Sequence, residues 1–200
     1  MEKRPAAAKR VSPIVVALRD PKQMPLALAS PHRTVFILSS SLNTISDMVA
    51  QVQARKKEAY IHFDLVEGLG KDAHGLRWLA ETARPTGILT TRAPLVSHAK
   101  ALGLSTIQRM FLLDSQSIHT GLHLVKDVKP DFLEVMPGIL PEIIQQLVQL
   151  NLCPVIAGGL CKTIAHYKAA RQAGAVAIST SDRELWKYQS DGGVKQPTVS

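Results

Sequence analysis

Two short segments near the carboxyl end of the chain carry residue types that bind anions. One apolar run ends in Gly158 and Gly159, and a second, one strand–helix unit further on, ends in Ser179 and Thr180. Backbone N–H groups exposed in a glycine turn and at a helix N-terminus form a cradle for phosphate. We therefore expect these four residues to hold a phosphate group, with the two hydroxyls as additional donors. The alternative is structural, since a glycine pair also marks a close approach of two backbones.

Charged residues also lie within or at the end of apolar runs, where an unpaired charge is costly. Asp64, Arg109 and Glu134 are placed in this way, and Gly138 follows the run that contains Glu134. We expect these four residues to line a ligand pocket, in which Asp64 and Glu134 accept hydrogen bonds from ligand hydroxyls. A buried ion pair between Arg109 and Glu134 is the alternative. The two carboxylates are also conceivable as a general acid and base.

Other reactive side chains give weaker signals, and we predict neither a metal site nor a catalytic residue. His119 and His123 have a helical spacing that suits zinc, but no HExxH glutamate accompanies them. Cys153 and Cys161 flank one predicted strand, whose extended part alone spans about 13 Å, so a disulfide is not expected. Cys161 lies near a predicted helix start, where a thiolate is favoured, although an inert, semi-buried thiol is the preferred interpretation.

The elements that must position these residues alternate between strand and helix. Eight apolar runs predict strands at 14–18, 34–38, 59–64, 87–90, 105–109, 132–135, 153–157 and 175–179. Each gap has room for a crossover helix, and prolines at 21, 25 and 31 make the first crossover irregular. Eight evenly spaced units indicate a single TIM-barrel-like (β/α)8 domain, in which phosphate is commonly held after strands seven and eight.

Composition bounds the class of protein. The chain has 200 residues, 46% of them hydrophobic but only 4% aromatic, and a net charge of +8. It lacks both an 18-residue apolar run and a signal peptide, so we expect a cytoplasmic protein with no membrane contact. We expect a basic, disordered tail at 1–11, the barrel at 12–188 and a flexible tail at 189–200.

Several segments together resemble one known family. They are residues 61–69, 71–72, 87–92, 106–115, 129–138, 157–160 and 179–186. In these segments and their order the chain is similar to the glycerol uptake operon antiterminator regulatory proteins. The resemblance implies a TIM-barrel-like fold, glycerol 3-phosphate as effector without a further cofactor, and binding to leader mRNA of glycerol-utilisation operons, which prevents a terminator hairpin from forming.

The resemblance and the composition favour different functions for the protein. Composition alone favours a small TIM-barrel enzyme, a lyase or isomerase acting on a sugar phosphate, whereas the resemblance favours a sensor; the fold does not decide between them. The sparse catalytic constellation and the basic charge favour the sensor, and a homodimer is left open. Basic residues that follow predicted strands are the candidates for contact with RNA phosphates, with a merely solvated basic surface as the alternative. These candidates are Lys71, Arg92, Lys162, Arg183 and Lys187.

Overall fold

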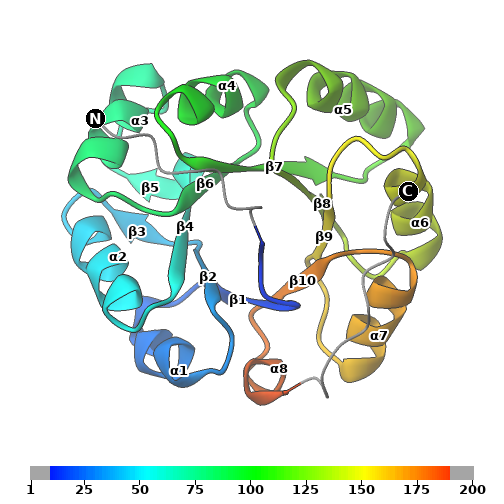
Figure 1. Ribbon diagram of the computed structural model, residues 1–200, viewed down its shortest axis with the longest axis horizontal. Helices are drawn as coiled ribbons and strands as arrows, with labels where there is room; N and C mark the ends of the chain where they lie inside the picture. Colours follow the sequence, from blue (N-terminus) through cyan, green and yellow to red (C-terminus); the bar gives the residue numbers. More distant parts are fainter. Residues whose placement is uncertain (1–9, 190–200) are drawn as a thin grey trace.

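The computed structural model describes residues 10–189, which form a closed barrel of parallel strands inside a ring of helices (Figure 1). Around the barrel the strand order is β1-β2-β4-β6-β7-β8-β9-β10, and β10 pairs with β1 to close it. This arrangement confirms the predicted TIM-barrel-like (β/α)8 fold. The barrel strands are β1 (Ile14–Leu18), β2 (Thr34–Ile37), β4 (Glu58–His62), β6 (Gly87–Thr90), β7 (Ser105–Phe111), β8 (Phe132–Met136), β9 (Val155–Gly158) and β10 (Ala177–Thr180).

A helix follows each barrel strand. Pro141 occupies the first turn of its helix, and Gly174, with φ +95°, follows the end of another, as proline and glycine do at helix starts and stops. The first crossover is irregular as predicted, because a 3-10 turn, η1 (Pro21–Gln23), precedes a short helix. The helices are α1 (Met24–Ala29), α2 (Ile45–Ala54), α3 (Ala73–Thr82), α4 (Ala93–Ala101), α5 (Ser115–Val128), α6 (Pro141–Gln149), α7 (Ile164–Gln172) and α8 (Arg183–Lys187).

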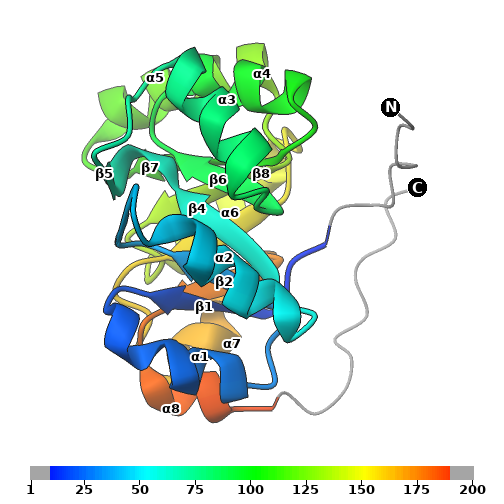
Figure 2. The same ribbon diagram turned by 90° about the vertical axis from the view of Figure 1, so that its left-hand side faces the viewer.

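Two details of the barrel differ from the sequence-based expectation. Asp64 does not end a strand: β4 stops at His62, and Asp64 lies in a 3-10 turn, η2 (Phe63–Leu65), that turns its carboxylate toward β6. The strand expected from residue 153 begins at Val155 instead, so Cys153 precedes it. In addition, β3 (Ser40–Ser41) and β5 (Val66–Glu67) form a small sheet that was not predicted; β5 lies at the carboxyl end of the barrel, on the left of Figure 2.

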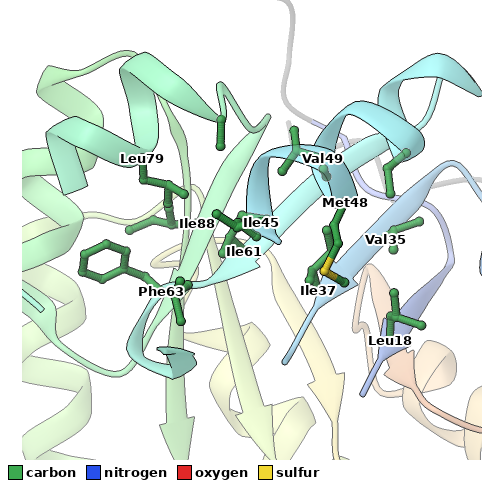
Figure 3. Packing of buried hydrophobic residues seen from close by; sticks show 14 of the residues in the cluster. Leu18, Val35, Ile37, Ile45, Met48, Val49, Ile61, Phe63, Leu79 and Ile88 are labelled. Atoms are coloured by element: carbon green, nitrogen blue, oxygen red, sulfur yellow. The ribbon is translucent and has the colours of Figure 1, made fainter. Parts of the chain in front are cut away.

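Side chains alternate between the barrel interior and the helix layer, as the period of two along a strand requires. Val15 and Ala17 belong to the interior cluster, whereas Leu18 packs in the layer between strands and helices. Figure 3 shows this outer layer, where Ile37 of β2 lies beside Met48 of α2. The aliphatic core is therefore divided between a filled barrel and a surrounding shell.

The predicted tails, 1–11 and 189–200, lie almost entirely outside the described residues. Among residues 10–189, the helices are too short or too polar to cross a membrane.

At Gly87, the backbone of β6 packs closely against the neighbouring strands β4 and β7. Gly87→Ala should lower the free energy of unfolding by about 1–3 kcal/mol, because a Cβ at Gly87 would overlap the carbonyl oxygen of Ser105 and lie 2.7 Å from the ring of Tyr60. Gly70→Ala is the matched control, since its Cβ would meet only the Asp72 carboxylate at 3.4 Å. Denaturant unfolding measures both, and an equal effect of the two substitutions would contradict this packing.

Candidate anion-binding site

A charged layer lies directly above the apolar interior of the barrel. Alternate residues along a strand share a face. The layer is therefore formed by the residues two positions beyond interior Tyr60, Ile107, Phe132 and Ala177. The residues of the layer are His62, Arg109, Glu134 and Ser179. Four strands that are distant in sequence thus contribute one polar group each to the same level of the barrel.

These groups form a connected chain of contacts. Arg109 Nε lies 2.6 Å from Glu134 Oε2, and Ser179 Oγ donates to Glu134 Oε1 at 2.5 Å. Arg109 Nη1 approaches His62 Nδ1 at 3.5 Å. The ion pair considered as an alternative is therefore present, and Glu134, with 0% exposure, supports the site from below instead of facing a ligand as expected.

Glycine residues allow the backbone to pack directly against these polar side chains. A Cβ on Gly158 would come within 2.6 Å of Glu134 Oε1, and one on Gly138 within 2.7 Å of the Gly158 nitrogen. The Gly138 N–H also donates to the Gly159 carbonyl at 3.1 Å. Close backbone approach is thus one reason for glycine at both positions, and Gly138 acts here by holding the 158–159 turn.

A pocket of about 330 Å³ opens above the charged layer. It brings together the ends of β9 and β10, the two segments predicted to bind phosphate. Its lining consists of Ala17, Arg19, Leu38, Arg109, Met136, residues 159–162 and residues 179–181. Gly159, Ser179, Thr180 and Arg109 therefore line one cavity, whereas Gly158, Gly138, Glu134 and Asp64 are not part of its lining.

Among the described residues, this pocket is lined by three cations, Arg19, Arg109 and Lys162, and by no carboxylate. Within residues 10–189, neither Arg19 nor Lys162 has an acidic side chain within ion-pair distance. Lys162 was predicted as an RNA contact but lies on the pocket wall. Arg19 was not predicted as a site residue; its position two residues beyond interior Ala17 is the sequence signal that identifies it.

The turn after β9 has an unusual backbone. Gly159 has φ +69° and Leu160 has φ +59°, and the second value is uncommon for a residue with a side chain. The N–H groups of Leu160 and Ser181 have no acceptor among residues 10–189. Both residues line the pocket, so their N–H groups are available to an anion.

The two hydroxyls predicted as phosphate donors have other acceptors in this structure. Ser179 donates to Glu134, and Thr180 Oγ1 donates to the Cys161 carbonyl at 2.6 Å. An anion in this geometry would therefore be held by backbone N–H groups and cations. Burial raises the pKa of the Cys161 thiol to about 11, which favours the inert thiol preferred above, and both cysteines are free.

Asp64 has a separate structural role at the end of β6. Its carboxylate accepts hydrogen bonds from Thr90 Oγ1 at 2.8 Å and from the Thr91 N–H at 2.7 Å. Burial favours the neutral form, but the contacts with His62, Thr91 and Thr90 outweigh this effect and hold the pKa of Asp64 below its usual range. In this structure Asp64 anchors the loop that carries Arg92, and both of its oxygens are engaged.

The remaining candidates lie outside the pocket. Lys71 and Arg92 are joined, since Arg92 Nη1 donates to the Lys71 carbonyl at 3.1 Å, and Lys187 pairs with Glu184 at 2.8 Å. His119 and His123 are exposed neighbours on α5, with their Nε2 atoms 3.3 Å apart. No group of three candidate metal ligands occurs in the part of the chain that the structure describes.

Comparison with known proteins finds one matching family and similar proteins in three organisms. Residues 14–186 match a family described as glycerol-3-phosphate responsive antiterminator. The glycerol uptake operon antiterminator regulatory protein of Listeria monocytogenes is 32% identical, with a TM-score of 0.84 over 92% of this chain and 98% of that chain. A glycerol uptake operon antiterminator-related protein from Thermotoga maritima is 27% identical, with a TM-score of 0.78 over 88% of this chain and 98% of that chain. An uncharacterized Escherichia coli protein, YgcP, is 32% identical over 177 residues, 88% of this chain and 93% of that protein.

The contacts of Asp64 predict a pH-dependent contribution to stability. Because the pKa of Asp64 is lower in the folded protein than the value of about 3.9 in an unfolded chain, the ionised group stabilises the fold above that pH, and the stabilisation is lost as the pH falls below about 4. Asp64→Asn should therefore be less stable than wild type at neutral pH, and the difference should shrink in acid. Denaturant unfolding from neutral pH to about pH 3 measures this; Glu81→Gln, at an exposed position on α3, should leave the profile unchanged. A pH-independent loss in Asp64→Asn would refute the assignment.

Proposed function

The chain belongs to the family of glycerol-3-phosphate responsive antiterminators, and from this premise we propose that glycerol 3-phosphate binds in the pocket between the ends of β9 and β10. The observation that carries the proposal is the charge of that pocket. Arg19 and Lys162 enter it without acidic partners among the described residues. A phosphate monoester carries about −1.5 to −2 charges at neutral pH, which matches these two cations.

The remaining lining suits the small carbon chain of this effector. A volume of about 330 Å³ lies at the lower end of the range for small-molecule sites. Ala17, Leu38 and Met136 provide apolar contact, while the turn at Gly159 and Leu160 supplies N–H groups. We assign the phosphate to the turns and cations, and the glycerol carbons to the apolar wall.

A sensor is favoured over an enzyme by the state of the two candidate acid–base groups. Glu134 has one oxygen on Arg109 and the other on Ser179, and Asp64 is held by Thr90 and Thr91. A general acid or base needs to reach the substrate proton, and neither carboxylate faces the pocket. We therefore propose that effector binding is read out by regulation without chemical conversion.

The partner in this regulation is proposed to be leader mRNA of glycerol-utilisation operons in the cytoplasm. The solved relatives are named for antitermination in glycerol uptake operons, and the chain carries a net charge of +8. Lys71 and Arg92, on adjoining loops at the carboxyl end, are the strongest candidates for RNA phosphate contacts. Arg183 and Lys187 of α8 are further candidates, and Lys162 is assigned first to the effector.

The effector proposal is tested by a matched pair of substitutions at Gly159. Asp and Asn both tolerate the positive φ found there, but only Asp adds a negative charge beside the anion. Gly159→Asp should weaken binding of glycerol 3-phosphate at least tenfold more than Gly159→Asn, as measured by calorimetry, and glycerol should bind wild type far more weakly than its phosphate. Phosphorus NMR of the same samples should show unchanged effector. Equal affinities of the two variants would place the phosphate elsewhere, and steady turnover would identify an enzyme.

The RNA proposal is tested by salt dependence. Each phosphate contact on a single strand should lower log affinity by about 0.7 for a tenfold rise in salt. Arg183→Glu and Lys187→Glu should weaken leader RNA binding and flatten the slope, whereas Lys168→Glu, on the exposed side of α7, should not. Effector should tighten the RNA complex, and by linkage RNA should tighten effector binding by the same factor. If both α8 reversals match Lys168→Glu, RNA does not contact α8.

A further inference from the structure

A second hollow lies beside the effector pocket, between the end of β7 and α5. Its volume is about 480 Å³, and Arg109 contributes to the walls of both cavities. Phe111, Leu124 and Met110 supply its apolar surface. The proposed effector site does not use this hollow.

The hollow presents an aromatic ring to solvent. Phe111 is 47% exposed and Leu124 43% exposed, although both line a concave surface next to the barrel rim. The chain contains only 4% aromatic residues, so a half-exposed ring at a cavity is not a common feature of this surface. Exposed apolar groups gathered in a hollow indicate a binding surface.

Gln108 contributes a polar group to the wall of the hollow. Gln108 is 4% exposed, and its Nε2 donates to the Thr91 carbonyl at 2.9 Å, which fixes the orientation of the amide. Its Oε1 has no hydrogen-bond partner among residues 10–189. A buried acceptor without a partner is costly, and a ligand with an N–H or O–H donor would satisfy it.

Cations stand next to the same hollow. Thr91 lines it, and the side chain of the following residue, Arg92, is 53% exposed, lies 3.8 Å from Asp64 Oδ1 and donates to the Lys71 carbonyl. Asp114 is the single carboxylate in the lining, and it is engaged in capping α5 by accepting from the Ser117 N–H at 2.6 Å. The hollow therefore combines an aromatic ring, a buried acceptor without a hydrogen-bond partner in its wall and a basic edge.

We propose that this hollow binds one unstacked base of single-stranded leader RNA. The base stacks on Phe111, its exocyclic amino group donates to Gln108 Oε1, and Arg92 and Lys71 bind the neighbouring phosphates. Stacking on an aromatic ring with amide contacts to base edges and basic groups along the backbone is how proteins hold single-stranded RNA. The inference rests on the proposed RNA function, and it places RNA next to the effector, with Arg109 between them.

The acceptor atom, Gln108 Oε1, determines which bases the hollow should prefer. Adenine, cytosine and guanine carry exocyclic amino groups, whereas uracil has none. Oligonucleotides with an amino-bearing base at the unstacked position should therefore bind more tightly than otherwise identical ones with uracil there. A second copy of this chain in the hollow would give no such base preference.

The test uses two replacements of Phe111 that separate the aromatic face from apolar bulk. Phe111→Leu should weaken leader RNA binding by about five- to a hundredfold, while Phe111→Trp should retain it and show fluorescence that RNA quenches beyond the change seen in wild type. Leu150→Ala, at another exposed apolar position, should bind RNA as wild type does. Calorimetry should give the wild-type affinity for glycerol 3-phosphate in Phe111→Leu, which shows that the fold is intact.

The outcomes separate this inference from the proposed function. If wild type binds leader RNA and Phe111→Leu binds it equally well, the inference is overturned and the antiterminator proposal stands. If wild type binds no leader RNA, the RNA proposal fails and the inference fails with it. Loss of a dimer in Phe111→Leu by ultracentrifugation, with RNA affinity unchanged, would show that the hollow is a contact between two copies and would equally overturn it.

Discussion

The ion pair between Arg109 and Glu134 is the interaction on which the site depends. Glu134 is completely buried inside the barrel, where an unpaired carboxylate would be prohibitively costly. Arg109 on one side and Ser179 on the other satisfy it, so β7, β8 and β10 are tied at one level. The same pair orients Arg109 between the effector pocket and the neighbouring hollow. Removal of either partner would leave a buried charge and disturb both cavities.

The glycines follow from this constraint. A fully buried carboxylate leaves no room for a side chain on the turn above it, and a Cβ at Gly158 would collide with Glu134 and Ser179. The backbone therefore lies on the charged layer, and the next two residues, Gly159 and Leu160, turn through positive φ at the wall of the pocket. The structural alternative considered for the glycine pair is therefore also present, because the same glycines are needed to cover the ion pair.

This arrangement supports the proposed sensor function in a barrel fold that is common among enzymes. The carboxylates that an enzyme would aim at its substrate are here engaged in holding strands and loops together: Glu134 ties the barrel interior, and Asp64 anchors the loop after β6. The cations that line the pocket, Arg19 and Lys162, are proposed to bind the charge of the effector. Function in this fold is decided by which polar groups remain available at the strand ends.

The sequence by itself determined the order of strands and helices, the closed barrel and the position of the turns after β9 and β10, because hydrophobic periodicity and turn residues are local properties. It also singled out Arg109, Glu134 and the glycine pair. It could not decide which charges face a ligand, since that depends on contacts between residues far apart in the chain. Only the tertiary structure paired Arg109 with Glu134, turned Asp64 onto Thr90 and Thr91, and brought Arg19 from the first strand to the Gly159 turn. Barrel closure between β1 and β10 is the physical reason, because it makes neighbours of the two ends of the sequence.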